Sequence, residues 1–264
     1  MSLAIATWNV NSLRVRLDHL AQWTTDNPDV DVICLQETKV EDHLFPHDAC
    51  ASMGWIHRAV HGQKTYNGVA ILSKRPLEEV QLGFAVGEPD EQARLIRATV
   101  DGVRVFGCYI PNGNSVGSPK FSYKLAWLKR LRAELAADTA PDRQVLVCGD
   151  FNIAPHEDDV WDPWAAENSI LFHPLEHKAL NKVTSWGLVD SLRQVHPKGN
   201  HFSWWDFRGG GFRRNQGFRI DHLWVTHSLA NRLTDVRTDR DVRGWDRPSD
   251  HVPVTACFKD AEPS

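Results

Sequence analysis

Short apolar runs rich in β-branched residues alternate along the chain with longer segments in which apolar residues recur every three or four positions. The short runs predict strands at LAIATW, VDVICLQ, VAILSK, RLIRATV, VRVFGCYI, QVLVCGD, IDHLWV and VPVTACF. The longer segments predict helices over Val15–Asp26, Tyr123–Ala137 and His177–Trp186. Runs such as VLVC are apolar on both faces, which is typical of central strands covered by helices. The alternation predicts an α/β fold.

The segments between these elements carry turn residues, as in PNGNSVGSP, RGGGFRRNQG and WDRPSD. No linker, repeat or low-complexity tract divides the chain, and 264 residues are compatible with one α/β domain. Two βα-rich halves, 1–143 and 144–258, are expected to form two sheets packed together. We therefore expect a single domain over 1–258, followed by a short C-terminal tail over 259–264.

Composition excludes several classes of protein. No apolar stretch approaches the roughly 20 residues that span a bilayer, and the N-terminal MSLAIATWNV lacks the basic region of a signal peptide. The five cysteines form no CxxC pair, and three lie inside apolar runs. This placement predicts reduced, mostly buried thiols rather than a zinc site or a disulfide framework. Together these features favour a cytoplasmic protein without a membrane partner.

The net charge of −4 does not by itself indicate a polyanionic partner, but the charges are unevenly distributed. Between Arg193 and Arg219 there are six Lys and Arg residues and one Asp, and between Lys120 and Arg132 there are five and no acid. A single basic run is usually a solvated surface. Two such segments, one of them rich in aromatic residues, favour a groove that binds a phosphate backbone.

Polar side chains stand at the ends and beginnings of the predicted strands, where α/β proteins place ligands. They are Asn9, Asn11, Glu37, Tyr109, Asn112, Asp150, Asn152, Asp221, Asp250 and His251. Any one of them alone is usually a turn former. The carboxylates among them would repel one another unless a cation compensates their charge. Because they are oxygen ligands, they suit a hard divalent ion.

The SDH sequence that ends at His251 adds an acid–base group. A neutral histidine beside a carboxylate can take a proton from water or donate one, and the carboxylate fixes its tautomer. We expect Asp221 to be this partner. The other histidines are expected to be structural.

Six motifs resemble the motif set of the exonuclease III family of abasic-site endonucleases: WNVNSLR, LQETK, GDFNIAP, FSWWDFR, NQGFRID and PSDHVPV. They occur in that family's order between Ala6 and Val254. LQE and SDH alone would indicate only the wider deoxyribonuclease I-like endonuclease/exonuclease/phosphatase superfamily, whereas the FSWW and RID stretch is typical of the DNA-repair branch. The resemblance implies a four-layer α/β sandwich, in which two mixed β-sheets pack face to face with helices outside.

The resemblance also implies Mg²⁺-dependent hydrolysis of DNA phosphodiesters, with Mn²⁺ expected to substitute. It implies that Glu37 is the principal metal ligand and that Asn11 and Asp250 lie near the same ion. Asp150 and Asn152 complete the expected metal-binding set. Whether the site holds one metal ion or two stays open.

The resemblance assigns catalytic roles as well. Asp150 stands where the family orients or deprotonates the attacking water, and Asn9 and Asn152 would hold Asp150 and the phosphate. Tyr109 would donate to a phosphate oxygen or stabilise the leaving oxygen. His251 would contact the scissile phosphate from its pairing with Asp221. The general base can be either Asp150 or His251 on these grounds. The full catalytic set is Asp150, His251, Asp221, Tyr109, Asn152 and Asn9.

Residues that match DNA-contacting positions of the family form three groups. Trp204, Phe218 and Ile220 would line an apolar pocket that accepts a bare deoxyribose and excludes a base. A loop suited to entering a groove follows FSWW, and Trp205 is expected to belong to the core instead. The remaining expected contacts are Arg208, Phe212 and Arg213 in that loop, and Asn112, Lys124 and Arg94 at the phosphate backbone.

The resemblance leaves the balance of activities open. The leading hypothesis is a monomeric enzyme that acts on double-stranded DNA as an abasic-site endonuclease, 3′-phosphodiesterase and 3′→5′ exonuclease. The segment Pro155–Lys182 lies near the expected pocket and can shift this balance toward 3′-end processing. A same-fold phosphatase or phospholipase is disfavoured by the FSWW and RID motifs. A non-catalytic nucleic-acid-binding regulator is disfavoured because the expected catalytic residues are all present.

Overall fold

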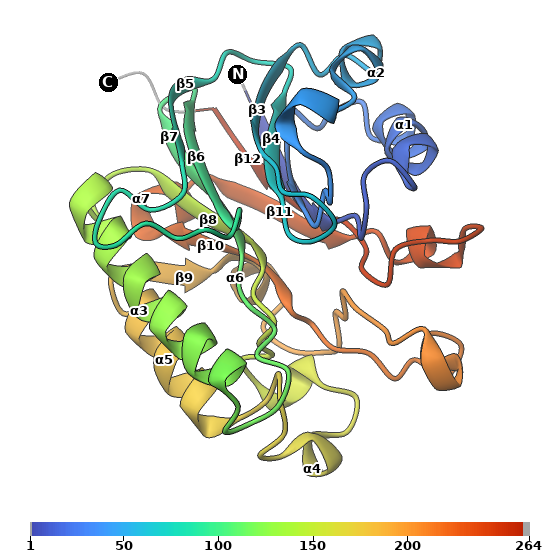
Figure 1. Ribbon diagram of the computed structural model, residues 1–264, viewed down its shortest axis with the longest axis vertical. Helices are drawn as coiled ribbons and strands as arrows, with labels where there is room; N and C mark the ends of the chain where they lie inside the picture. The colour runs from blue at the N-terminus through green and yellow to red at the C-terminus, as the bar shows by residue number, and fades with distance from the viewer. Residues whose placement is uncertain (1, 261–264) are drawn as a thin grey trace.

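The apolar runs form the central strands of two six-stranded sheets in the computed structural model, which describes residues 2–260 (Figure 1). The first sheet contains β1 (Leu3–Asn9), β2 (Val32–Gln36), β3 (His57–His61), β4 (Val69–Ser73), β11 (Leu233–Thr238) and β12 (Val254–Phe258). The second contains β5 (Glu78–Leu82), β6 (Leu95–Val100), β7 (Val103–Tyr109), β8 (Val145–Asp150), β9 (Leu188–Asp190) and β10 (Asp221–Thr226). Each predicted strand is present, with its boundaries shifted by one or two residues.

The sheets do not follow the two halves of the sequence, so the expected division at residues 143 and 144 is wrong. The strand orders are β11-β12-β1-β2-β4-β3 and β5-β6-β7-β8-β10-β9. The C-terminal β11 and β12 therefore complete the first sheet. The N-terminal half in turn supplies β5, β6 and β7 to the second. Both sheets are mixed, because β1 pairs with β2 and β7 with β8 in parallel while the other neighbours are antiparallel.

Helices cover the outer face of each sheet, which confirms the four-layer sandwich. Helices α1 (Leu17–Asp26) and α2 (His47–Ser52) lie on the first sheet, and α3 (Pro119–Asp138) and α5 (Pro174–Thr184) lie on the second, at opposite sides of Figure 1. The short helices are α4 (Pro163–Ala166), α6 (Ser191–Val195) and α7 (His227–Ala230). Within residues 2–260, none of the helices has the length and apolar character that a membrane span requires.

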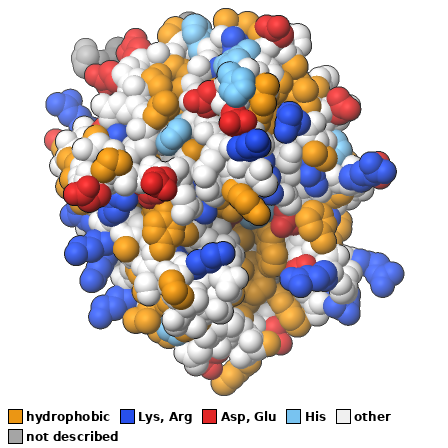
Figure 2. Space-filling view, in the orientation of Figure 1, with side chains coloured by type: hydrophobic (Ala, Val, Ile, Leu, Met, Phe, Trp, Pro, Cys, Tyr) orange, Lys and Arg blue, Asp and Glu red, His pale blue; other side chains and the backbone are white. Residues whose placement is uncertain are grey.

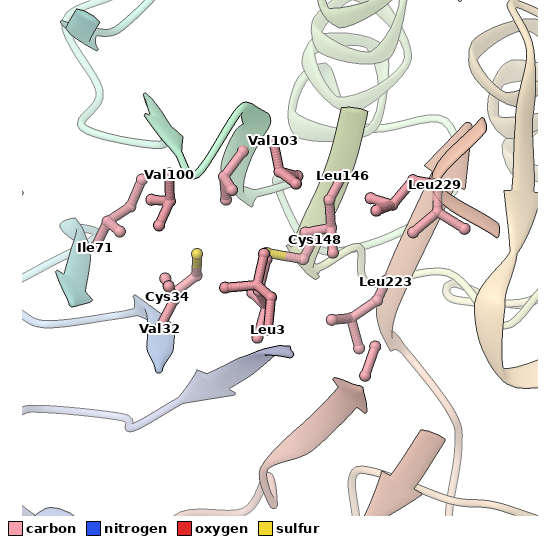
Figure 3. Close-up of a cluster of buried hydrophobic side chains, with 14 of the residues drawn as sticks. Leu3, Val32, Cys34, Ile71, Val100, Val103, Leu146, Cys148, Leu223 and Leu229 are labelled. Atoms are coloured by element: carbon pink, nitrogen blue, oxygen red, sulfur yellow. The ribbon is translucent and has the colours of Figure 1, made fainter. Parts of the chain in front are cut away.

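Three apolar layers hold the sandwich together. The central one fills the space between the sheets with aliphatic side chains and thiols, including Leu3, Cys34, Leu146, Cys148 and Leu223 (Figure 3). In the two outer layers, bulky tryptophan side chains pack between each sheet and its helices. All five cysteines are free and four are buried, which confirms the prediction of reduced thiols.

Helix α3 begins at Pro119 and not at Tyr123 as predicted. Ser118 caps it, because its side chain accepts a hydrogen bond from the Phe121 backbone N–H and the proline follows at the first helical position. Helices α1 and α5 likewise begin and end within a few residues of their predicted limits. Of the predicted tail over 259–264, residues 261–264 lie outside the described residues.

Candidate active site

Strand ends bring the predicted site residues to one edge of both sheets. The parallel strands β1 and β2 end at Asn9 and immediately before Glu37. The parallel strands β7 and β8 end at Tyr109 and Asp150. Because neighbouring parallel strands end at the same side, each sheet contributes two polar side chains to this edge.

Antiparallel strands begin where the parallel ones end. Asp221 is the first residue of β10 and pairs with Asp150 in the register of β8. The SDH motif, which ends at His251, precedes β12 and so reaches the same edge beside β1. Gly149 lets β8 approach β7 closely, because its φ is +141° and a Cβ atom there would lie 1.8 Å from the carbonyl oxygen of Cys108.

The Asn9 side chain links the two sheets. Its fully buried amide Nδ2 donates to Glu37 Oε1 at 2.9 Å and to Asp150 Oδ2 at 3.0 Å. The Tyr109 hydroxyl donates to the same Glu37 oxygen at 2.8 Å. Burial, the Glu37 carboxylate and Asp150 raise the pKa of Tyr109 well above its usual value, so this phenol stays protonated. Two carboxylates from different sheets therefore share one amide donor.

His251 lies between two carboxylates. Its Nδ1 atom is 2.8 Å from Asp221 Oδ2, and its Nε2 atom is 3.7 Å from Asp150 Oδ2. Burial opposes the imidazolium charge, but Asp221 and Asp150 outweigh it and raise the pKa of His251 to about 10. The structure thus brings together the pair expected from the sequence, with the other ring nitrogen facing Asp150.

The cluster carries more negative charge than its protein partners compensate. Burial raises the pKa of Asp150 to about 7, and although His251 opposes the shift, the carboxylates of Asp221 and Glu37 add to it. Asp221 Oδ1 is buried without a hydrogen-bond partner among the described residues. One ligand atom each of Asp150, Asp221 and His251 lies within 4.8 Å of the others, a group that could hold a metal ion. The donor set therefore fits a cation.

Glu37, Asn11 and Asp250 form a second oxygen-rich group next to this one. Asn11 Nδ2 donates to Asp250 Oδ1 at 3.0 Å. The ammonium of Lys39 lies 2.7 Å from Glu37 Oε2. Burial would raise the pKa of Glu37, but Lys39 and the hydrogen bonds from neighbouring side chains hold it below its usual value. Glu37, Asn11 and Asp250 are therefore a second set of oxygen ligands that could hold a cation.

Asn152 is buried and hydrogen bonded on both sides of its amide. Its Oδ1 accepts from Asn112 Nδ2 at 2.9 Å, and its Nδ2 donates to the Ile110 carbonyl at 3.0 Å. Its backbone N–H donates to Asp150 Oδ1 at 2.9 Å. Asn152 therefore positions Asp150 and connects it to Asn112.

Lys124 was expected to contact backbone phosphate, and the structure corrects this. Its side chain is fully buried and forms an ion pair with Glu176. Its ammonium also donates to the carbonyl of Asn152 at 2.6 Å. Because an ammonium in this position has no path to a phosphate, Lys124 supports the loop after β8 and does not bind DNA directly.

Arg94 lies beside the site at an open hollow. Its guanidinium stacks 4.4 Å from the centre of the Tyr109 ring, and its Nη1 donates to the Tyr109 carbonyl at 3.2 Å. Lys120, Asn112 and the exposed Tyr66 line the same hollow. Other Lys and Arg side chains are spread along both borders of the face in Figure 2.

The residues expected to line an apolar pocket lie in a packed apolar cluster. Trp204 and Phe218 pack edge to face at 5.8 Å, and Ile220 beneath them is buried. Val160 and Phe172, from the segment that follows β8, fill the same cluster. The segment Pro155–Lys182 therefore contributes directly to the wall of the expected pocket. Trp205 is fully buried in the core, as predicted.

The loop that follows FSWW is anchored by aromatic and cationic side chains. Phe212 packs edge to face on Trp205 at 5.2 Å, and the Arg240 guanidinium lies 4.5 Å from the Phe212 ring centre. Arg208 and Arg213 project from this loop and are exposed. Arg208 pairs with Asp206 at 3.0 Å, and both arginines lie at the surface of the loop.

Sequence reasoning missed three residues of the site. Ser203 donates its hydroxyl to Asp221 Oδ2 at 2.6 Å, and Ser249 donates to the Asn9 carbonyl at 2.7 Å. Both serines, and Lys39, stand inside the motifs FSWW, SDH and LQETK. Their signal was their place in these motifs, but their contacts depend on the tertiary fold.

Comparisons with known proteins agree with this geometry. Residues 6–251 match the Endonuclease/Exonuclease/phosphatase family. The chain is 35% identical to exodeoxyribonuclease III of Haemophilus influenzae, covering 96% of this chain and 98% of that one. The solved 3′ phosphatase NExo from Neisseria, bound to a product DNA hairpin, has a TM-score of 0.93 at 43% identity, covering 97% and 99% of the chains. An AP endonuclease from Archaeoglobus fulgidus has a TM-score of 0.93 at 38% identity, covering 98% and 100%.

Proposed function

The chain belongs to the Endonuclease/Exonuclease/phosphatase family, and we propose that it is a Mg²⁺-dependent DNA-repair nuclease that hydrolyses phosphodiesters at abasic sites and blocked 3′ ends. It is a hydrolase of the exodeoxyribonuclease III type. The observation that carries the proposal is the Asn9 amide, which holds Glu37 and Asp150 at one point between the two sheets. The proposal assigns metal binding to Glu37 and acid–base chemistry to Asp150, the two carboxylates that share this donor.

Glu37, Asn11 and Asp250 would hold the Mg²⁺ ion, since hydrogen bonds connect them: Asn9 donates to Glu37 and accepts from the Asn11 backbone N–H, and the Asn11 side chain donates to Asp250. When bound, the ion supplies a Lewis acid that stabilises negative charge on the phosphate. Mn²⁺ also prefers oxygen ligands and would substitute. The family is metal-dependent, and the choice of Mg²⁺ is part of the proposal.

Asp150 and His251 would accept and donate protons during hydrolysis. The attacking water would lie beside Asp150, which orients it, and its proton would pass to Asp150, or to His251 in molecules whose imidazole is neutral. The bond between phosphorus and the 3′ oxygen then breaks, and the leaving oxygen takes a proton to give a 3′-hydroxyl. Asp221 keeps His251 oriented throughout. Tyr109 and Asn9 donate to Glu37 and Asp150 in this structure, and each would exchange one of these hydrogen bonds for one to a phosphate oxygen as charge develops there.

We propose double-stranded DNA as the partner and a monomer as the working unit. Support for the monomer comes from the site itself, because a single chain supplies every residue assigned a role. Arg94, Arg208 and Arg213 would contact the phosphate backbone.

A second candidate function is 3′-end processing with little cleavage at internal abasic sites. Val160 and Phe172 already occupy the cluster that an extruded deoxyribose would enter beside Trp204, Phe218 and Ile220. Cleavage at a blocked 3′ end needs no extruded sugar at that position, so the filled cluster should slow this reaction less than cleavage at an internal abasic site.

A cleavage assay on two labelled duplexes distinguishes these functions. One duplex carries an internal abasic-site analogue, and the other carries a nick with a 3′-phosphate. Both are incubated with Mg²⁺ and then with EDTA. Rapid incision of the first supports the leading proposal, and activity confined to the second supports 3′-end processing. If neither is cut although the duplexes bind, the proposed nuclease activity is wrong.

A Glu37→Ala variant tests the metal assignment in the same assay. We expect it to lose Mg²⁺-dependent cleavage while it still binds duplex DNA. Normal cleavage by this variant in chelated and re-metallated buffer would contradict the assignment of Glu37 as a metal ligand.

A further inference from the structure

The ammonium of Lys39 lies between the oxygens that we assign to the metal. Its Nζ atom is 2.6 Å from Asn11 Oδ1 and 2.7 Å from Glu37 Oε2. We propose that Lys39 is a built-in counter-ion, which takes the place of the divalent cation in the metal-free enzyme and must swing out before the ion binds. This inference rests on the proposed function, because it presupposes the metal site at Glu37 and Asn11.

The backbone around Lys39 is fixed, so any movement must come from its side chain. Asn11, Glu37 and Lys39 have φ values of 43°, 51° and 51°, in the left-handed region. Backbone hydrogen bonds lock these turns: the Ser12 N–H donates to the Glu37 carbonyl at 2.8 Å, and the Lys39 N–H to the Asn67 carbonyl at 3.0 Å. The backbone of Glu37 and Asn11 is therefore held in place, and Glu37 Oε1 is held as well by Asn9 and Tyr109.

Charge explains why an internal cation is needed there. Glu37 lies next to Asp150 through their shared Asn9 donor, and Asp250 accepts from the other end of the Asn11 side chain. Carboxylates this close and this well buried repel one another without a compensating charge. The lysine side chain supplies that charge, and its 25% exposure leaves it a path toward solvent.

The ammonium and a divalent ion cannot share this position. Mg²⁺ holds its oxygen ligands at roughly 2.0–2.1 Å and repels other cations at such range. An ammonium in hydrogen-bond contact with the same two oxygens therefore excludes the ion. Only molecules in which Lys39 has swung out can bind the metal ion. The apparent dissociation constant for the metal therefore equals the intrinsic constant divided by the fraction of molecules in this state.

Lys39→Met tests this directly, because methionine keeps most of the side-chain length and removes the charge. Binding of Mn²⁺ to the DNA-free protein is measured from the loss of the free-ion signal in electron paramagnetic resonance. We expect the Kd for Mn²⁺ to fall roughly tenfold in this variant. Lys39→Gln is a second neutral variant with the same expectation. Lys129→Met, on the exposed side of α3, removes one positive charge far from the site and should leave the Kd unchanged.

Thermal unfolding of the same proteins gives an independent readout. In EDTA, Lys39→Met should have a lower Tm than the wild type, because Glu37 has lost its cation. Saturating Mn²⁺ should then raise its Tm by more than that of the wild type. An unchanged or higher Kd in both neutral variants, or an equal metal-induced rise in Tm, would overturn the role of Lys39. If the wild type itself binds no Mn²⁺, the metal assignment of the proposed function fails as well.

Discussion

Asp221 and His251 form a buried pair in which the carboxylate Oδ2 lies 2.8 Å from the imidazole Nδ1. Ser203 donates to the same Asp221 oxygen, so the carboxylate cannot rotate away. The Nε2 atom faces Asp150, 3.7 Å from its Oδ2. In the proposed mechanism Asp221 is therefore a positioning residue, which acts on the substrate only through His251.

We expect Asp221→Asn to lower the single-turnover rate of cleavage by about 10²-fold, because the imidazole loses the partner that fixes its tautomer and stabilises its charge. Binding to duplex DNA should change little. Asp235→Asn makes the same chemical change at an exposed position of β11 and should cleave normally. A near-normal rate for Asp221→Asn would remove the pair from the mechanism.

Arg219 should be one of the largest single contributors to stability. Its fully buried guanidinium pairs with Asp159 and Asp190, and so joins the segment after β8 to the end of β9. Arg219→Met would leave the Asp190 carboxylate without its ion-pair partner and Asp159 with Arg193 alone, at a cost of about 3–5 kcal/mol in the free energy of unfolding. Urea titration measures this cost. Arg214→Met at the exposed loop is the control, and a similar small effect for both variants would contradict the prediction.

The contribution of His222 to stability should be lost as the pH drops below about 6.5, whereas Asp150, with its pKa raised to about 7, changes stability in the opposite direction. Burial, with Arg219 adding to it, lowers the pKa of His222 to about 4. Between this value and the ordinary histidine pKa, the imidazole is protonated in the unfolded chain and neutral in the folded protein. The stabilisation is therefore complete above the ordinary histidine pKa and is lost as the pH falls toward 4. Urea midpoints measured from pH 7 to pH 4 report it. His222→Gln should reduce the slope over this range, and an unchanged slope would assign the acid sensitivity to other groups.

Substitutions of Lys124 and Arg213 should affect different properties, stability for Lys124 and DNA binding for Arg213. Lys124→Met leaves Glu176 buried without its partner and should cost about 3–5 kcal/mol, with no change in the salt dependence of DNA binding. Arg213→Met should leave stability unchanged and lower the slope of log Kd against log salt by about 1. A change in the salt slope for Lys124→Met would instead support the phosphate contact that the sequence predicted for Lys124.

Strand prediction succeeded in the middle of each sheet and failed at its edges. The strands absent from the prediction are β3, β5, β9 and β11, and these are the outermost strands in the two sheet orders. A central strand is covered on both faces, so it must be apolar. An edge strand such as β5, which is exposed along its whole length, can carry EEVQL. The place of β5 in the sheet is set by its pairing with β6, and the local sequence pattern does not predict this pairing.

The sequence by itself determined the central strands, the family motifs and the polar residues at the strand ends, because each depends on local patterning or short motifs. Only the tertiary structure decided which side chains meet. Lys124 and Lys39 each follow a hydroxyl-bearing residue and precede an aliphatic one in the sequence, yet one is buried against Glu176 and the other lies over Glu37. The difference arises from packing between elements far apart in the chain, where desolvation and distance fix what a charge can do.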